Sequence, residues 1–179
     1  MLLLLTILST PFAHDFTPEQ QKRGASLERD AFRVLGSWGA LNVVGGGLGI
    51  MLQDEPQARA FHTMNAGWGA VNLGLALTGH ISSRHRSSIE SQSERWLRLP
   101  SIFALNAGLD VAYISAGSWL WWQGNSNEMA TQKGWGQSLI IQGGALLVFD
   151  TWMAAKFNAL NRSIWVASLP HGLAIQGEF

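Results

Sequence analysis

The run from Leu99 to Gln123, LPSIFALNAGLDVAYISAGSWLWWQ, is long enough to cross a lipid bilayer and carries a single charged residue, Asp110. A helix needs about 20 mostly apolar residues to span the hydrocarbon core. An amphipathic helix of a soluble protein would instead place charges along its wet face. The run therefore predicts a membrane-spanning helix, and it raises the question of what a lone carboxyl group does inside it.

Three further runs resemble this one in length and in lack of charge. Val34 to Gln53 and Ala60 to Ile81 contain no Asp, Glu, Lys or Arg, and Gly134 to Ala155 contains only Asp150. Charged residues make up 13% of the chain, against roughly 25% in a typical soluble domain. We therefore predict an all-α fold, a transmembrane four-helix bundle. A soluble helical bundle is the alternative, because the runs contain many polar side chains.

The positive charges are distributed unevenly about the four runs. Of the 12 Lys and Arg residues, only Arg59 and Lys133 follow the first or third run; all others lie before the first run, between the second and third, or after the fourth. Positive residues concentrate on the cytoplasmic side of membrane proteins. Both termini are therefore predicted to be cytoplasmic, in the inner (cytoplasmic) membrane. Tryptophans typical of an interfacial belt gather at the opposite face: Trp119, Trp121, Trp122 and Trp135.

The chain divides into three predicted parts. These are an N-terminal region, 1–33, the four-span bundle, 34–161, and a C-terminal tail, 162–179. The N-terminal region starts with a short apolar segment, 1–13, which lacks the basic region of a signal peptide. We expect this segment to remain uncleaved, because export of the N-terminus would invert the charge distribution.

An amphipathic cytoplasmic helix is predicted to follow this apolar segment. Thr17, Pro18 and Gln20 have the order of a capping box, with Thr17 as N-cap, proline at the first helical position and glutamine at the third. We expect this helix to lead directly into the first span.

Small residues recur at a spacing of four, which permits close approach of membrane helices. Gly45 and Gly49 form a GxxxG pair in the first span. The third span carries an unbroken ridge of small residues: Ala104, Gly108, Ala112 and Ala116. We expect these residues to pack helices tightly, and to offer faces for a homo-oligomer or a larger membrane complex.

Polar residues lie on one stripe of each predicted helix, where they can face a common interior. Counting inward from the span ends places one polar residue of each helix near the bilayer midplane: Asn42, Asn72, Asp110 and Gln142. Asn106 and Tyr113 share the stripe of Asp110, and Asn65 shares that of Asn72. We expect these seven residues to form one mid-membrane polar site.

The four runs contain no Lys or Arg to neutralise Asp110. A charged aspartate at the centre of a helix costs about 2.5 to 3.5 kcal/mol on insertion scales. Asp110 is therefore either a neutral acid that holds helices together by hydrogen bonds, or the binding group for a proton, a cation or another ligand. Asp150 is expected near the cytoplasmic end of its helix, where Lys156, Arg98 or water can satisfy it.

Other chemistries find little support. His62 and His80 would lie about 27 Å apart on one helix, too far to share a haem or metal. The chain has no cysteine, and it lacks the GxxxxGK[ST], HExxH and GxSxG motifs. The 12 Lys and Arg balance the 12 Asp and Glu, which gives no reason to expect a nucleic-acid partner. We expect no enzymatic activity, no cofactor and no metal, and the lipid bilayer as the surrounding medium.

Part of the sequence repeats, since WGALN at Trp38 to Asn42 recurs as WGAVN at Trp68 to Asn72. With this pattern the chain resembles small bacterial four-helix membrane proteins of uncharacterised families, from Arg29 to Asn161. The resemblance implies an architecture and assigns no catalytic residue. The first hypothesis is a structural or accessory subunit that packs through its glycine-rich faces. The alternative is a small carrier or a proton or cation pathway centred on Asp110.

Overall fold

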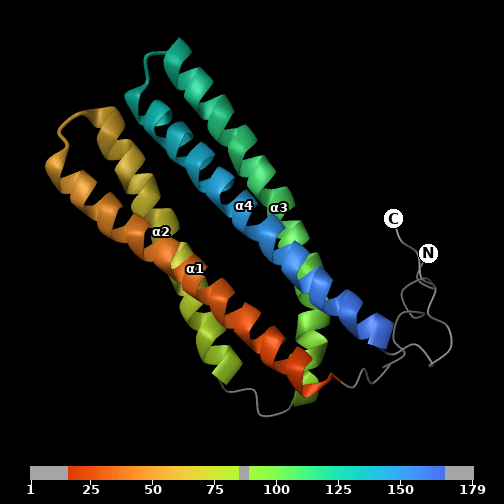
Figure 1. Ribbon diagram of the computed structural model, residues 1–179. Helices are drawn as coiled ribbons and strands as arrows, with labels where there is room; N and C mark the ends of the chain where they lie inside the picture. Colours follow the sequence, from red (N-terminus) through yellow and green to blue (C-terminus); the bar gives the residue numbers. More distant parts are fainter. Residues whose placement is uncertain (1–15, 85–88, 168–179) are drawn as a thin grey trace, which may run out of the picture.

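Four long helices make up the structure, a computed structural model that describes residues 16–84 and 89–167. The helices are α1 (Pro18–Leu52), α2 (Pro56–Arg84), α3 (Ile89–Ser126) and α4 (Ala130–Ala167). Short turns join α1 to α2 and α3 to α4 at one end of the bundle, here called the loop end (Figure 1). The predictions for residues 1–13 and for the tail beyond residue 167 lie outside the described residues.

The capping box predicted at the start of α1 is confirmed. The backbone N–H of Gln20 donates to the hydroxyl of Thr17 (3.3 Å), and the backbone N–H of Thr17 donates to Oε1 of Gln20 (2.9 Å). Pro18 occupies the first turn, where its missing N–H costs nothing. From there α1 continues to Leu52, so the predicted cytoplasmic helix and the first span are one helix.

The helices form two antiparallel hairpins, α1 with α2 and α3 with α4 (Figure 1). Helix α4 also packs along α2 and, over a shorter length, against α1. It is therefore the central helix of the bundle. Its polar side chains can meet those of every other helix.

A pair of glycines brings the backbones of each hairpin together. A Cβ atom added to Gly39 would lie 2.8 Å from the carbonyl oxygen of Gly69, and one added to Gly69 would lie 2.7 Å from that of Gly39. Gly117 and Gly136 have the same relationship, at 2.8 and 2.6 Å. Gly39 and Gly69 are the glycines of the repeated WGA motif. The repeat therefore marks a point of close approach between α1 and α2.

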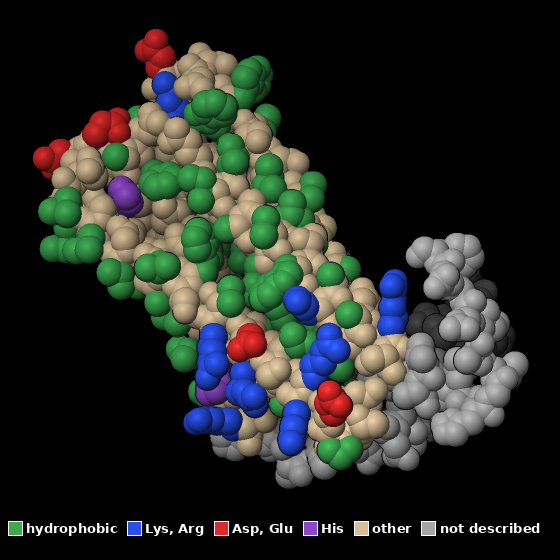
Figure 2. Space-filling model, viewed as in Figure 1, with side chains coloured by type: hydrophobic (Ala, Val, Ile, Leu, Met, Phe, Trp, Pro, Cys, Tyr) green, Lys and Arg blue, Asp and Glu red, His purple; other side chains and the backbone are tan. Residues whose placement is uncertain are grey.

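The end of the bundle opposite the loop end has a compact apolar core. Its buried residues come from α1, α3, α4 and the residue before the Thr17 cap: Phe16, Ala31, Trp96, Leu99, Met153, Phe157 and Leu160. Glu28 ties α1 to α3 here, since it pairs with Nε of Arg95 (2.9 Å) and accepts a hydrogen bond from Nε1 of Trp96 (3.2 Å). Lys and Arg side chains gather on this end, here called the basic end (Figure 2).

The flanks of the bundle are apolar. Large hydrophobic side chains such as Leu41, Leu105 and Val148 are 68 to 70% exposed, and such side chains are spread over the surface above the basic end (Figure 2). Helices α1, α3 and α4 are long and apolar enough to cross a membrane, and α2 is not among these three. By helix length and hydropathy the chain is a multi-pass membrane protein, with its apolar flanks in the lipid bilayer.

Candidate functional site

A hydrogen-bonded group of polar side chains, here called the amide cluster, lies in the interior toward the loop end. Gln142 is at its centre: Nε2 donates to Oδ1 of Asn42 (2.6 Å) and of Asn65 (2.9 Å), and Oε1 accepts from Nε1 of Trp38 (2.9 Å). The hydroxyl of Ser138 also donates to Oδ1 of Asn65 (2.6 Å). The cluster therefore joins α1, α2 and α4.

Burial explains why the amide cluster is so fully bonded. Gln142 and Ser138 have almost no exposed surface, and a buried polar group without partners costs about 1 to 3 kcal/mol. Sequence analysis did not identify Trp38 and Ser138 as members. Each lies one helical turn before a predicted member, Asn42 and Gln142 respectively. Extending the polar stripes by one turn would have found both.

A second polar group, here called the carboxyl pair, lies between α3 and α4 near the middle of both helices. The carboxyl groups of Asp110 and Asp150 are neighbours in the interior, and Asn106 lies beside Asp150. The two aspartates are only 2% and 4% exposed. Two adjacent carboxyl groups can form a hydrogen bond to each other only if one of them keeps its proton. A shared proton also avoids two negative charges side by side in a medium of low polarity.

The expectation that Lys156, Arg98 or water would satisfy Asp150 is wrong. Helix α4 continues to Ala167, so Asp150 lies more than four turns from its end and is buried. Lys156 instead places Nζ over the ring of Trp152, 5.9 Å from its centroid. Asp150 faces Asp110, which makes it part of the interior site.

The predicted mid-membrane residues thus divide between two groups. Asn42, Asn65 and Gln142 lie in the amide cluster, whereas Asn106 and Asp110 lie with the carboxyl pair. The reason is geometric, because helical side chains tilt toward the N-terminus of their own helix. A Cβ on Gly143 would lie 2.9 Å from the carbonyl oxygen of Asp110, so Asp110 and Gln142 have nearly the same depth. Since α3 and α4 are antiparallel, their side chains diverge.

The two remaining predicted residues, Asn72 and Tyr113, belong to α2 and α3. The ring of Tyr113 contacts that of Trp68, with centroids 4.9 Å apart. Asn72 follows Trp68 by one turn, and Asp110 precedes Tyr113 by about one turn. Because α2 and α3 run in opposite directions, Asn72 and Asp110 lie at the same level of the bundle. Both are buried, and among the described residues Nδ2 of Asn72 and Oδ2 of Asp110 have no hydrogen-bond partner.

Some of the residues predicted to pack helices together contact another helix, and others are exposed. Gly49 lies against the imidazole of His62 in α2, but a Cβ on Gly45 would meet nothing within 4 Å, and the neighbouring Gly46 contacts α2 instead. Gly108 also has open space beside it. All four members of the α3 ridge are exposed, on its outer face: Ala104, Gly108, Ala112 and Ala116. Within the bundle, Gly117 brings α3 to α4.

Comparison with known proteins identifies a family. No curated protein and no solved structure matches the chain. Residues 34–151 match the model of a family of unknown function, DUF6992. The match begins where the first span was predicted to begin and ends one residue after Asp150, so it contains the amide cluster and the carboxyl pair. The chain therefore belongs to the DUF6992 family, whose function is unknown.

Proposed function

We propose that this integral membrane protein is a small carrier that binds a proton, or a monovalent cation in its place, at the carboxyl pair. The observation that carries the proposal is that Asp110 and Asp150, on two adjacent helices, meet in the buried interior. Ionisable residues within membrane spans mark ion and proton pathways. On this proposal the protein acts by binding and transfer and is not an enzyme.

A purely structural role explains the carboxyl pair less well. The hairpin of α3 and α4 is already closed by the contact of Gly117 with Gly136, and the amide cluster shows that uncharged side chains can join helices in this bundle. Replacing buried ionic groups by other well-packed residues is often neutral or stabilising. Two carboxyl groups therefore add a site for exchangeable protons that packing does not require.

The unpartnered atoms beside the pair support an occupant of this site. Nδ2 of Asn72 on α2 is a donor and Oδ2 of Asp110 on α3 is an acceptor, and the two residues lie at one level of the bundle. Buried polar atoms of this kind are normally satisfied by protein or by ordered water. A water held between them would contact the pair directly and provide a route for its proton. A divalent metal is less favoured, since the described residues contain no group of three or more His, Asp or Glu able to hold one.

The proposal includes a membrane crossing by α2. Its polar residues Asn65 and Asn72 face inward and are at most 8% exposed, whereas apolar side chains on its outer surface are more than half exposed: Val71, Leu75, Leu77 and Ile81. Mean hydropathy weights all faces equally, so it underestimates how apolar the lipid-facing side is. With four spans, the charge distribution supports the proposal that both termini lie in the cytoplasm and that the protein lies in the inner membrane.

An accessory subunit is the second candidate, and the outer face of α3 favours it. The small-residue ridge lies exposed on a helix that packs mainly against α4: Ala104, Gly108, Ala112 and Ala116. Such faces let helices of separate chains approach closely. This candidate predicts association with a second copy or with a larger membrane complex.

Proton flux in proteoliposomes separates the two candidates. Asp110→Asn keeps the shape of the side chain but removes an ionisable group, so we expect it to abolish flux driven by a pH gradient while the protein remains folded. Asp54→Asn, on the exposed turn between α1 and α2, is the matched control and should retain the flux. If Asp110→Asn changes only stability or oligomer size, the carrier proposal fails and the accessory role is favoured.

A further inference from the structure

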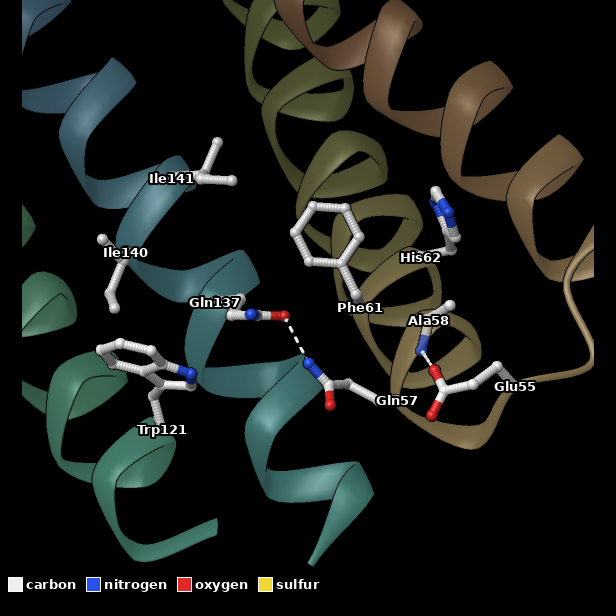
Figure 3. Close-up of a pocket in the computed structure, with 9 residues that line it drawn as sticks. All are labelled: Glu55, Gln57, Ala58, Phe61, His62, Trp121, Gln137, Ile140 and Ile141. Carbon is white, nitrogen blue, oxygen red and sulfur yellow. Dashed lines mark hydrogen bonds between the residues drawn. The ribbon is translucent and has the colours of Figure 1, made fainter. Parts of the chain in front are cut away.

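A cavity of about 540 Å³ opens on the flank of the bundle near the loop end (Figure 3). It lies between the start of α2 and the segment Gln137 to Ile141 of α4, and Trp121 of α3 closes one side. Gln137 of the cavity and Asp150 of the carboxyl pair lie about 20 Å apart along α4 at 1.5 Å per residue. The cavity is therefore a separate site, and the inference drawn from it does not depend on the carrier proposal.

The lining of this cavity changes from polar to apolar with depth. Glu55 and Gln57 lie at the start of α2, where Nε2 of Gln57 donates to Oε1 of Gln137 across the mouth (3.1 Å). Ile140 and Ile141 lie one turn further into the bundle on α4. Exposed tryptophans at the same end, Trp119, Trp122 and Trp135, are typical of the membrane interface. The polar mouth therefore lies at the interface and the isoleucines lie in the hydrocarbon.

This gradient matches an amphipathic lipid whose head lies at the mouth and whose tail points into the bilayer. The charge of the lining restricts the head group. None of the nine lining residues is Lys or Arg, and Glu55 adds a negative charge, so a phosphate head group would find no counter-charge. An uncharged head is favoured.

Aromatic rings and hydrogen-bond donors in the lining indicate which uncharged head group the cavity can bind. Phe61 and Trp121 both line the cavity and can stack on a flat ring. The side-chain amide of Gln137, the indole N–H of Trp121 and the imidazole of His62 can donate to carbonyl oxygens. The volume is within the range of roughly 300 to 1,000 Å³ of small-molecule sites. We propose that this cavity binds an isoprenoid quinone, with its ring at Phe61 and Trp121 and its tail along Ile141.

The test measures binding of decylbenzoquinone to the full chain in nanodiscs. Ile141→Trp fills the cavity, and Gln137→Leu removes a donor; each is expected to weaken binding about tenfold, which corresponds to about 1.4 kcal/mol. Val148→Trp is the matched control, because Val148 lies two turns further along the same face of α4 and is 70% exposed. We expect it to bind as the unmodified protein does.

Four results would overturn the proposal. Equal binding by Ile141→Trp and Val148→Trp would remove the cavity as the site. Unchanged binding by Gln137→Leu, or equal competition by decanol, would show that the tail alone is recognised. Photolabelling of the unmodified protein with an azidoquinone keeps the test independent of variant folding: label on residues 57–62, 121 or 137–141 supports the proposal, and label confined to other segments contradicts it.

Discussion

Asp110 of α3 and Asp150 of α4 place their carboxyl groups next to each other in the interior of the bundle, where the two residues are 2% and 4% exposed. Neither aspartate is therefore an isolated charge. A substitution at one aspartate therefore changes the surroundings of the other carboxyl group.

Asp150→Leu should destabilise the protein, because it leaves Asp110 and Asn106 without their buried partner. A loss of about 1 to 3 kcal/mol in the free energy of unfolding is expected. Asp150→Asn has nearly the same shape and can still donate and accept hydrogen bonds, so its cost should stay below about 1 kcal/mol. Unfolding in detergent measures both variants. Equal costs for the two would show that the pair contributes no hydrogen bonding to stability.

Gln142→Leu should destabilise the bundle by removing the centre of the amide cluster. Its three hydrogen bonds, to Trp38, Asn42 and Asn65, are lost together. At about 0.6 kcal/mol for a hydrogen bond in a membrane protein, the expected loss is about 2 kcal/mol. Gln53→Leu, at an exposed position after α1, serves as the control in the same unfolding experiment. A loss no larger than that of the control would mean that the cluster is energetically neutral.

Gly117→Ala and Gly108→Ala should have opposite effects although both lie in α3. A Cβ at Gly117 would meet Gly136, Leu139 and Ile140 at 2.8 to 2.9 Å, and such overpacking typically costs about 1 to 3 kcal/mol. A Cβ at Gly108 meets nothing within 4 Å, and alanine is the better helix former by up to about 1 kcal/mol. Thermal unfolding in detergent distinguishes them. Destabilisation of both to the same extent would contradict the described contact.

Gly108→Leu tests the outer face of α3 as an interface between chains. The side chain would project into open space, so the monomer should fold normally. If the small-residue ridge mediates association, the larger side chain should reduce the oligomer fraction in mild detergent, measured by light scattering. Leu105→Phe, at another exposed position of α3 (68%), is a control for added bulk. A folded variant with unchanged oligomer size would count against the accessory role.

The membrane crossing by α2 can be tested by labelling, because the chain has no native cysteine. Asp54→Cys and Ser83→Cys lie at opposite ends of the helix. We expect an impermeant maleimide to modify them from opposite faces of the membrane, with Ser83→Cys labelled from the cytoplasmic side. Leu75→Cys, on the apolar outer face, should resist labelling because lipid covers it. Labelling of both end positions from one side would exclude the crossing.

Several local features could be predicted because they depend on neighbouring residues in the chain. The capping box at Thr17 is an example, since its hydrogen bonds span only three positions. The uncharged runs likewise predict long apolar helices, because length and composition determine whether a segment can lie in lipid. The repeated WGA motif was visible in the sequence, but its meaning as the contact of Gly39 with Gly69 required the second helix.

The sequence by itself determined that the chain forms four long helices with apolar flanks, polar stripes and one basic end, because periodicity and hydropathy act along one segment at a time. Only the tertiary structure decided which stripes meet. Gln142 and Asp110 lie at nearly the same depth, but their side chains point in opposite directions because α3 and α4 are antiparallel. The extension of α4 beyond the predicted span buries Asp150 against Asp110. Side-chain direction and helix order are relations between segments, and the spacing of residues within one segment contains no information about them.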